Sequence, residues 1–414
     1  MLFNNFYNSD FFYYLRLFFV FVREILFGFW WLIIFLILGK IFFDLRKRYL
    51  EKQRRKKEEI KEWVTLAVKI NREILQTPKA MEQVFAGLHS LKDSSVSLEI
   101  FGQKKEVYFI ARLPKRYKKI FESQIYAQYP ELEIKEIEDY LAIFPPNLPN
   151  KFFDLWGGEI IFENQGCFPV QTYQFFEAAR EEKRIDPLAN LIEGISHLQE
   201  KEWLALQIII KPLDSKKWVE SGKKEIDKML GKKEPAKITW QDWTSAFFKN
   251  LAFSIFTPPV WPEEKKEEKS ASSSVFSSGS KEIIEKIEQK ISKLGFEATI
   301  RYLYIASPEV YDEINSLSVA AYFNQFNIKN LNSFRINENS LPEVKSKLFN
   351  KKRTFLKKID FYQNFLSRQP GKETIILNTE ELATIYHFPA LKVKAPALIR
   401  ILSKKGEPPT DLPI

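Results

Sequence analysis

A long apolar run at residues 25–43, ILFGFWWLIIFLILGKIFF, dominates the hydrophobic pattern of the chain. As a helix rising about 1.5 Å per residue, it would extend roughly 28 Å, close to the thickness of the hydrocarbon core of a bilayer. Its only charged residue, Lys40, lies near one end, where the amine can reach the polar interface. The run therefore predicts a transmembrane helix.

The charges on the two sides of this run predict its orientation. Residues 46–61, RKRYLEKQRRKKEEIK, are rich in Lys and Arg, whereas residues 1–24 carry nearly balanced charge. The positive-inside rule then places everything after Phe43 in the cytoplasm, on a single-pass protein of the inner (cytoplasmic) membrane. A cleaved signal peptide is the competing interpretation, but no small-residue cleavage site follows the run. The candidate contacts with anionic lipid are Arg46, Lys47, Arg48, Arg54, Arg55, Lys56 and Lys57.

Residues 1–24 contain a second apolar segment, residues 11–22, which Arg16 interrupts. Twelve residues are too few to cross a bilayer, so we expect an interfacial segment. A tight hairpin of two short spans is the alternative.

Beyond the anchor, the pattern predicts an α+β protein with two cytoplasmic subdomains, each a sheet with helices. Residues 44–91 are expected to form a basic, helical connector. The first domain is expected over residues 92–257 and the second over residues 281–390. Residues 258–280 are rich in Pro, Ser and charge, which predicts a disordered linker, and residues 391–414 form an extended tail.

Two segments suggest that one unit occurs twice. RLPKRYKKIFESQIYAQYP from Arg112 and IASPEVYDEINSLSVAAYFNQF from Ile305 both follow a predicted strand and enter a helix through a proline. Both end in aromatic residues around a glutamine. The pattern is consistent with a duplicated ferredoxin-like unit, and convergence on one packing pattern is the alternative.

Composition narrows the chemistry. The net charge of +10 favours anionic partners, but much of the excess lies in the basic run after the anchor. Cys167 is the only cysteine, so no internal disulfide forms. The three histidines are far apart, and no P-loop, H-E-x-x-H or G-x-S-x-G motif occurs. We expect no enzyme activity, no cofactor and no metal.

The clearest local signals lie near the C-terminus. Asn378 and Glu381 are spaced as a helix N-cap and its N3 partner. After the short helix, Tyr386, His387, Phe388 and Pro389 form a candidate docking patch, unless the helix packs on its own domain. Three apolar residues of the tail, Leu398, Ile399 and Ile401, are further candidates for docking.

Four stretches resemble the membrane-anchored N-terminal regions of type IV secretion and conjugation coupling ATPases. They are TPKAMEQVFAGLH from Thr77, ESQIYAQYPELEIKEIEDY from Glu122, FEATIRYLYIA from Phe296 and LNTEELATIYHFP from Leu377. In that family the module leads into a HerA/FtsK-like motor domain, through a tail similar to APALIRILSKKGEPPTDLP. This sequence ends at Ile414, so no Walker lysine or Mg²⁺-binding carboxylate can be carried over.

The resemblance implies a non-catalytic membrane module that positions a separate HerA/FtsK-like ATPase for DNA or protein translocation. The expected partners are membrane lipid, this ATPase and a second copy of the chain, with nucleic acid contacted indirectly. The alternative is a membrane-associated nucleic-acid-binding protein. Its candidate contacts are Lys115, Arg116, Lys118, Lys119, Lys351, Lys352 and Arg353.

Overall fold

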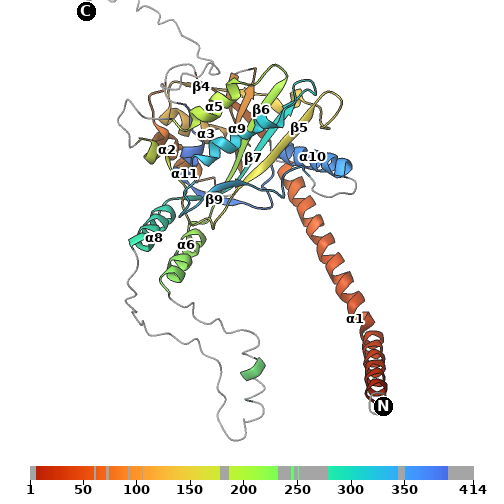
Figure 1. Cartoon of the computed structure of the whole chain (residues 1–414). Helices are drawn as coiled ribbons and strands as arrows, with labels where there is room; N and C mark the ends of the chain where they lie inside the picture. The colour runs from red at the N-terminus through yellow and green to blue at the C-terminus, as the bar shows by residue number, and fades with distance from the viewer. Residues whose placement is uncertain are drawn as a thin grey trace, which may run out of the picture. The chain divides into compact units, whose positions relative to one another are not determined.

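The computed structural model describes residues 6–59, 62–70, 74–91, 94–104, 106–177, 186–231, 244–246, 250, 278–343 and 350–389. The chain divides into two compact units, Met1–Glu62 and Trp63–Ile414. The first unit contains one continuous helix, α1 (Phe6–Glu59), drawn in red in Figure 1. This helix includes most of the predicted interfacial segment, the whole predicted span and the beginning of the predicted connector.

The described residues contain no helix that is both long and apolar enough to cross a membrane. Side chains at several positions of the predicted span, including Ile25 and Trp30, lie outside the described set. Those of Phe35, Leu36 and Phe43 are described, and they are 71%, 63% and 68% exposed.

The predicted helical connector over residues 44–91 was wrong in its second half. The helix ends at Glu59, and a strand, β1 (Trp63–Ile70), begins the second unit. The sequence WVTLAVKI favours a strand because it combines β-branched residues with an alternation of more and less buried positions. Helix α2 (Pro78–Leu88) follows, with Met81, Val84, Phe85 and Leu88 buried as their helical spacing predicts.

The first six elements of the second unit form a βαββαβ motif. After β1 and α2 come the hairpin of β2 (Val96–Gln103) and β3 (Glu106–Pro114), helix α3 (Lys118–Gln128) and strand β4 (Leu132–Ile137). The strands lie in the order β4-β1-β3-β2, and every neighbouring pair is antiparallel. This is the strand order of a ferredoxin-like unit.

The next elements repeat that motif. The repeat consists of β5 (Asp154–Phe162), α4 (Tyr173–Glu177), α5 (Leu188–Ser196), β6 (Glu202–Pro212), β7 (Gly295–Ala306), η4 (Glu313–Ser316), α9 (Leu317–Asn324) and β8 (Phe334–Ile336). Its strands lie in the order β6-β7-β5-β8, the mirror of the first order along the sheet. Helices α3 and α9 occupy equivalent places, in agreement with the similarity of the two proline-led segments. The topology therefore agrees with the predicted duplication.

The two repeats do not form separate domains, so the predicted division into residues 92–257 and 281–390 was wrong. Strands β2 and β6 pair from Val96↔Ile210 to Gln103↔Trp203 and join the repeats into one sheet. The predicted linker lies between β6 and β7, inside the second repeat. It follows α6 (Ser215–Met229) and precedes most of α8 (Ser278–Ile291), and residues 258–277 lie outside the described residues.

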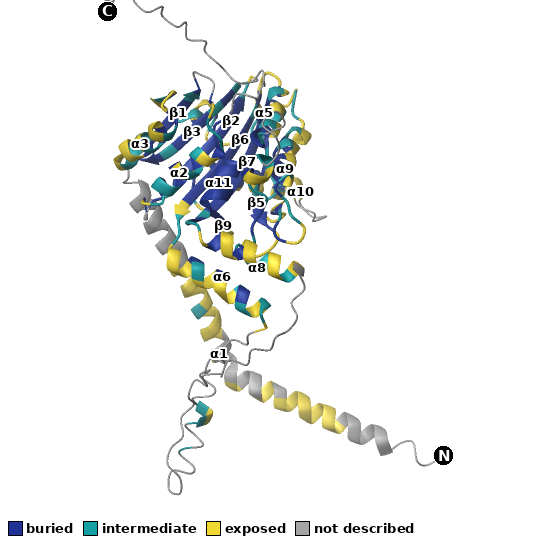
Figure 2. Cartoon of the chain, turned by 90° about the vertical axis from the view of Figure 1, so that its left-hand side faces the viewer, coloured by how far each residue is buried: buried dark blue, intermediate teal, exposed yellow. Residues whose placement is uncertain are grey.

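Helices cover the two faces of the sheet unequally. Apolar residues of α2, α3, α5, α9 and α11 (Thr379–Ile385) form the main core on one face. Figure 2 shows α11, almost entirely buried, in front of the central strands. On the other face, α10 (Asn350–Ser367) and the segment around η2 (Tyr140–Ile143) pack over a smaller cluster that includes Phe101, Leu303 and Tyr362. Strand β9 (Ile375–Asn378) pairs with the start of β7 and leads into α11.

Candidate functional site

A row of polar side chains crosses the sheet where the two repeats meet. In register, Glu99 of β2 lies opposite Gln207 of β6, which lies opposite Arg301 of β7, and Arg301 also lies opposite Glu159 of β5. Because paired residues in a sheet point to the same face, all four point toward α10. Gln207 Nε2 donates to Glu99 Oε1 at 3.3 Å, and Arg301 Nε donates to Glu159 Oε1 at 2.9 Å.

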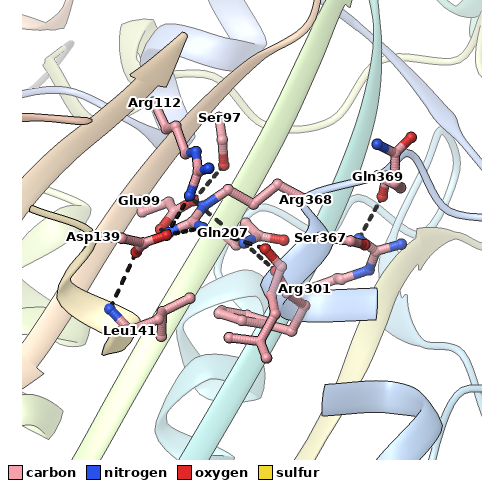
Figure 3. Close-up of polar contacts among 12 residues, drawn as sticks. Ser97, Glu99, Arg112, Asp139, Leu141, Gln207, Arg301, Ser367, Arg368 and Gln369 are labelled. Carbon is pink, nitrogen blue, oxygen red and sulfur yellow. Dashed lines mark hydrogen bonds and ion pairs between the residues drawn. The ribbon is translucent and has the colours of Figure 1, made fainter. Parts of the chain in front are cut away.

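Arg368, just after α10, covers the Glu99 end of this row (Figure 3). Its Nε and Nη2 donate to the two carboxylate oxygens of Glu99 at 2.6 and 3.2 Å. Its Nη1 and Nη2 donate to Asp139 at 2.8 and 2.9 Å. The backbone of Arg368 lies in the left-handed region, with a φ of 51°. This conformation is unfavourable for residues other than glycine. Two bidentate ion pairs therefore hold a strained residue in place.

The charges of this group balance. Burial raises the pKa of the Glu99 carboxyl, but Arg368 and the hydroxyl of Ser97 outweigh it and the net shift is downward. Burial likewise acts to raise the pKa of Asp139, but Arg368 and then Arg112 outweigh it and the net shift is downward. The two carboxylates thus face two guanidinium groups, since Arg112 also donates to Asp139. Glu99 and Arg368 are buried, whereas Asp139 and Arg112 are partly exposed at the edge of the group.

A second buried ion pair lies on the opposite face of the sheet, which α11 covers. Lys290 Nζ of α8 and Glu381 Oε1 of α11 are 2.9 Å apart, and both side chains are 0% exposed. Glu381 also accepts from the backbone N–H groups of Val170 and Asn378, the latter as part of the predicted capping box. Burial lowers the pKa of Lys290 and raises that of Glu381, and their mutual attraction opposes both shifts. The pair anchors α8, which begins at the end of the predicted linker, to the core.

The exposed candidate is a depression of about 840 Å³ beside the N-terminal half of α10. Its lining residues come from α10, the start of β5 and the segment after β7: Pro149, Asn150, Lys151, Asp154, Pro308, Tyr311, Asn350, Lys351, Thr354, Phe355 and Lys358. Lys358 is buried and paired with Asp154 at 2.6 Å. Lys151 and Lys351 are exposed and, within the described part of the chain, form no ion pair. The depression is therefore basic.

The described residues hold no group of three or more His, Cys, Asp or Glu side chains that could bind a metal ion.

The prediction of an exposed docking patch at residues 386–389 was wrong. Tyr386, His387 and Phe388 are each only 1% exposed, and Pro389 is buried as well. The ring of Phe388 packs at 5.1 Å from that of Tyr129, and His387 Nε2 lies 2.8 Å from Asp186 Oδ1. The alternative interpretation, a helix packed on its own domain, is the correct one, because the aromatic residues after α11 complete the main core.

The remaining predicted docking residues, Leu398, Ile399 and Ile401, lie outside the described residues. The predicted lipid contacts all fall in α1, where the Arg46 side chain is exposed. The side chains of the other six, Lys47, Arg48, Arg54, Arg55, Lys56 and Lys57, lie outside the description.

The predicted nucleic-acid contacts fall into two groups. In the first, several side chains take part in internal contacts: Lys118 pairs with Glu136 at 2.6 Å, and Arg116 Nη2 donates to Ser94 at 3.1 Å. In the second group, Lys351, Lys352 and Arg353 are exposed in the first turn of α10. Only this second group adjoins the depression.

Sequence reasoning missed Glu99, Arg368 and Lys151. A carboxylate at an inward position of an apolar strand is a detectable signal, because such a group needs a buried partner. The sequence VSLEIFG around Glu99 carries that signal, but nothing local indicates that Arg368 is the partner.

Residues 48–399 match the family described as "Domain of unknown function (DUF8128)", and the chain belongs to that family. Among curated proteins, none matches this chain significantly.

Proposed function

We propose that this member of the DUF8128 family is a non-catalytic membrane-anchoring and docking module. In this proposal α1 tethers the chain to the inner membrane, and the sheet domain positions a separate HerA/FtsK-like ATPase of a type IV secretion or conjugation-like system. The family match covers residues 48–399 and is silent on function. The resemblance of four sequence stretches to coupling ATPase modules supports the partner.

The observation that carries the proposal is the exposed apolar surface of α1. The Phe35, Leu36, Phe42 and Phe43 side chains are 71%, 63%, 62% and 68% exposed. A soluble monomer rarely leaves large contiguous apolar surface in water, so such a helix calls for lipid or protein around it. The Lys- and Arg-rich residues that follow suit the anionic cytoplasmic face of a bilayer.

The internal pairing of three carboxylates, two of them fully buried, supports a non-catalytic role. A catalytic acid or base needs a reacting atom within hydrogen-bond reach. Glu99, Asp139 and Glu381 instead use their oxygens on Arg368, Lys290 or backbone N–H groups. The purified chain is accordingly expected not to bind ATP, and saturable micromolar binding by calorimetry would contradict this expectation.

The test is co-purification from the native cell. The tagged full chain is extracted from membranes in mild detergent, and associated proteins are identified by mass spectrometry. A HerA/FtsK-like ATPase is the expected partner. Deleting residues 395–414, the apolar tail that leads into the motor in the resembling proteins, should abolish its recovery and leave the melting temperature unchanged. Undiminished recovery would refute docking through the tail, and recovery of no ATPase with the intact chain would refute the partner.

A further inference from the structure

One surface of the sheet domain combines exposed apolar side chains with lysines that form no ion pair with any described residue. We define the α10 patch as Lys151, Phe152, Lys351, Lys352, Phe355 and Leu356. Phe152, Phe355 and Leu356 are 72%, 45% and 54% exposed. Lys151, Lys351 and Phe355 line the same depression, so the loop before β5 and helix α10 contribute to one surface.

Helix α10 carries apolar residues on two sides, one exposed and one buried. Lys352, Phe355 and Leu356 are spaced i, i+3 and i+4, so they share one side of the helix. The opposite side carries Phe361 and Phe365, which pack on the sheet. The helix therefore buries one apolar stripe and exposes a second one, flanked by lysines.

The positive charges in the first turn of α10 do not favour the N-terminus of this helix. Lys351, Lys352 and Arg353 lie in the first turn, which contains no acidic residue. Cations at a helix N-terminus oppose the helix dipole. Neither Lys351 nor Lys352 has an ion-pair partner among the residues that the structure describes. An external anionic surface would offset this unfavourable charge.

We infer that the α10 patch binds the surface of an anionic lipid bilayer, an inference that rests on the proposed membrane anchor. Lysines next to exposed aromatic and aliphatic side chains are typical of interfacial binding, in which the rings enter the headgroup boundary and the amines contact phosphates. Leu356 favours lipid over a nucleic acid, because an aliphatic side chain enters the acyl region but offers bases no stacking surface.

The anchor makes even a weak patch effective. If residues 25–43 span the bilayer, residues 44–59 of α1 extend only about 24 Å further, and β1 begins at Trp63. Attachment to the bilayer makes contact of the patch with lipid an intramolecular event, which raises its effective concentration at the membrane above that of a free domain. The patch then needs little intrinsic affinity to hold the sheet domain on the lipid.

The experiment uses the full chain, with Cys167→Ser as background, reconstituted into vesicles that contain headgroup-spin-labelled phosphatidylcholine. A bimane fluorophore is attached at Leu356→Cys or, as control, at Phe175→Cys, another exposed apolar position. The nitroxide quenches bimane only on contact. The vesicles contain phosphatidylcholine alone or with phosphatidylglycerol. We expect several-fold stronger quenching at position 356 when phosphatidylglycerol is present, and no such change at position 175.

Charge-reversed variants identify the cause. Lys351→Glu with Lys352→Glu should abolish the quenching at position 356, whereas Lys223→Glu with Lys224→Glu, at two exposed lysines of α6, should leave it intact. A chain that resists alkaline carbonate extraction but shows no quenching at position 356 overturns the patch and leaves the anchor standing. A chain that carbonate releases overturns both. A third outcome would favour nucleic acid over lipid. In it, phosphatidylglycerol does not change the quenching at position 356, but a single-stranded oligonucleotide reduces that quenching.

Discussion

Glu99 and Gln207 lie directly opposite each other on β2 and β6, the two strands through which the repeats join. Their side chains are 3.3 Å apart and both are 0% exposed. In a duplicated sheet, apolar contacts alone would tolerate a shift by two residues, because the alternation is preserved. A polar pair covered by Arg368 penalises such a shift, so we interpret the row as the element that fixes the register of the two repeats.

Removing Arg368 should be strongly destabilising. Arg368→Met leaves Glu99 buried without its cation, a change expected to cost about 3–5 kcal/mol in the free energy of unfolding. Urea unfolding of the full chain in detergent, followed by circular dichroism, measures this cost. The control Lys352→Met removes an exposed cation of α10 and should change stability by less than about 0.5 kcal/mol. Equal stability of the two variants would show that the network contributes nothing.

The same network predicts a loss of stability in acid. Glu99 has an ordinary pKa of 4.5, and its pKa in the folded chain is lowered. Its contribution is therefore fully present above pH 4.5 and disappears as the pH falls through the folded pKa. Glu381, whose pKa is raised, changes in the opposite sense, so the informative quantity is a difference between variants.

Glu99→Gln should accordingly be less stable than the wild type at neutral pH, with the gap closing below pH 4.5. Unfolding curves of both proteins over an acidic pH series test this expectation. A gap that stays constant over the series would mean that Glu99 is not ionised in the folded chain.

Lys290 should hold α8 on the domain. Lys290→Met leaves Glu381 without its cation and is expected to cost about 3–5 kcal/mol, whereas Lys286→Met, at an exposed position of the same helix, should be nearly neutral. Hydrogen exchange with mass spectrometry localises the effect, with faster exchange expected in α8 and α11. Unchanged protection of both helices in Lys290→Met would contradict the anchoring role.

Local signals predicted much of the fold. The helical spacing in α2, the capping box at Asn378 and the helix after β3 could be predicted, because each depends on residues a few positions apart. The helix predicted to begin at Pro308 begins only at Leu317, after a turn and η4. The start of strand β5 could not be predicted from local signals. Gly157 lies inside that strand because Phe361 of α10 packs over it, and an added Cβ would lie 2.4 Å from the Phe361 ring. Such a contact joins residues far apart in the chain.

The same limit applies to the domains and the candidate site. Composition predicts a linker over residues 258–280, most of which lie outside the described residues, but it does not show that strands β6 and β7 pair with each other. The partner of Glu99 lies 269 residues away, at Arg368. The aromatic residues after α11 looked like a docking patch because their partners, Phe109 and Tyr129, are equally distant in sequence.

The membrane anchor is the central claim, and alkaline carbonate extraction of native membranes tests it most directly. The wild-type chain should stay in the membrane pellet. Ile34→Lys with Ile37→Lys, which adds roughly 2.5–3.5 kcal/mol of insertion cost per residue, should move the chain to the supernatant with the melting temperature of its sheet domain unchanged. Release of the wild-type chain by carbonate would contradict the anchor and the function built on it.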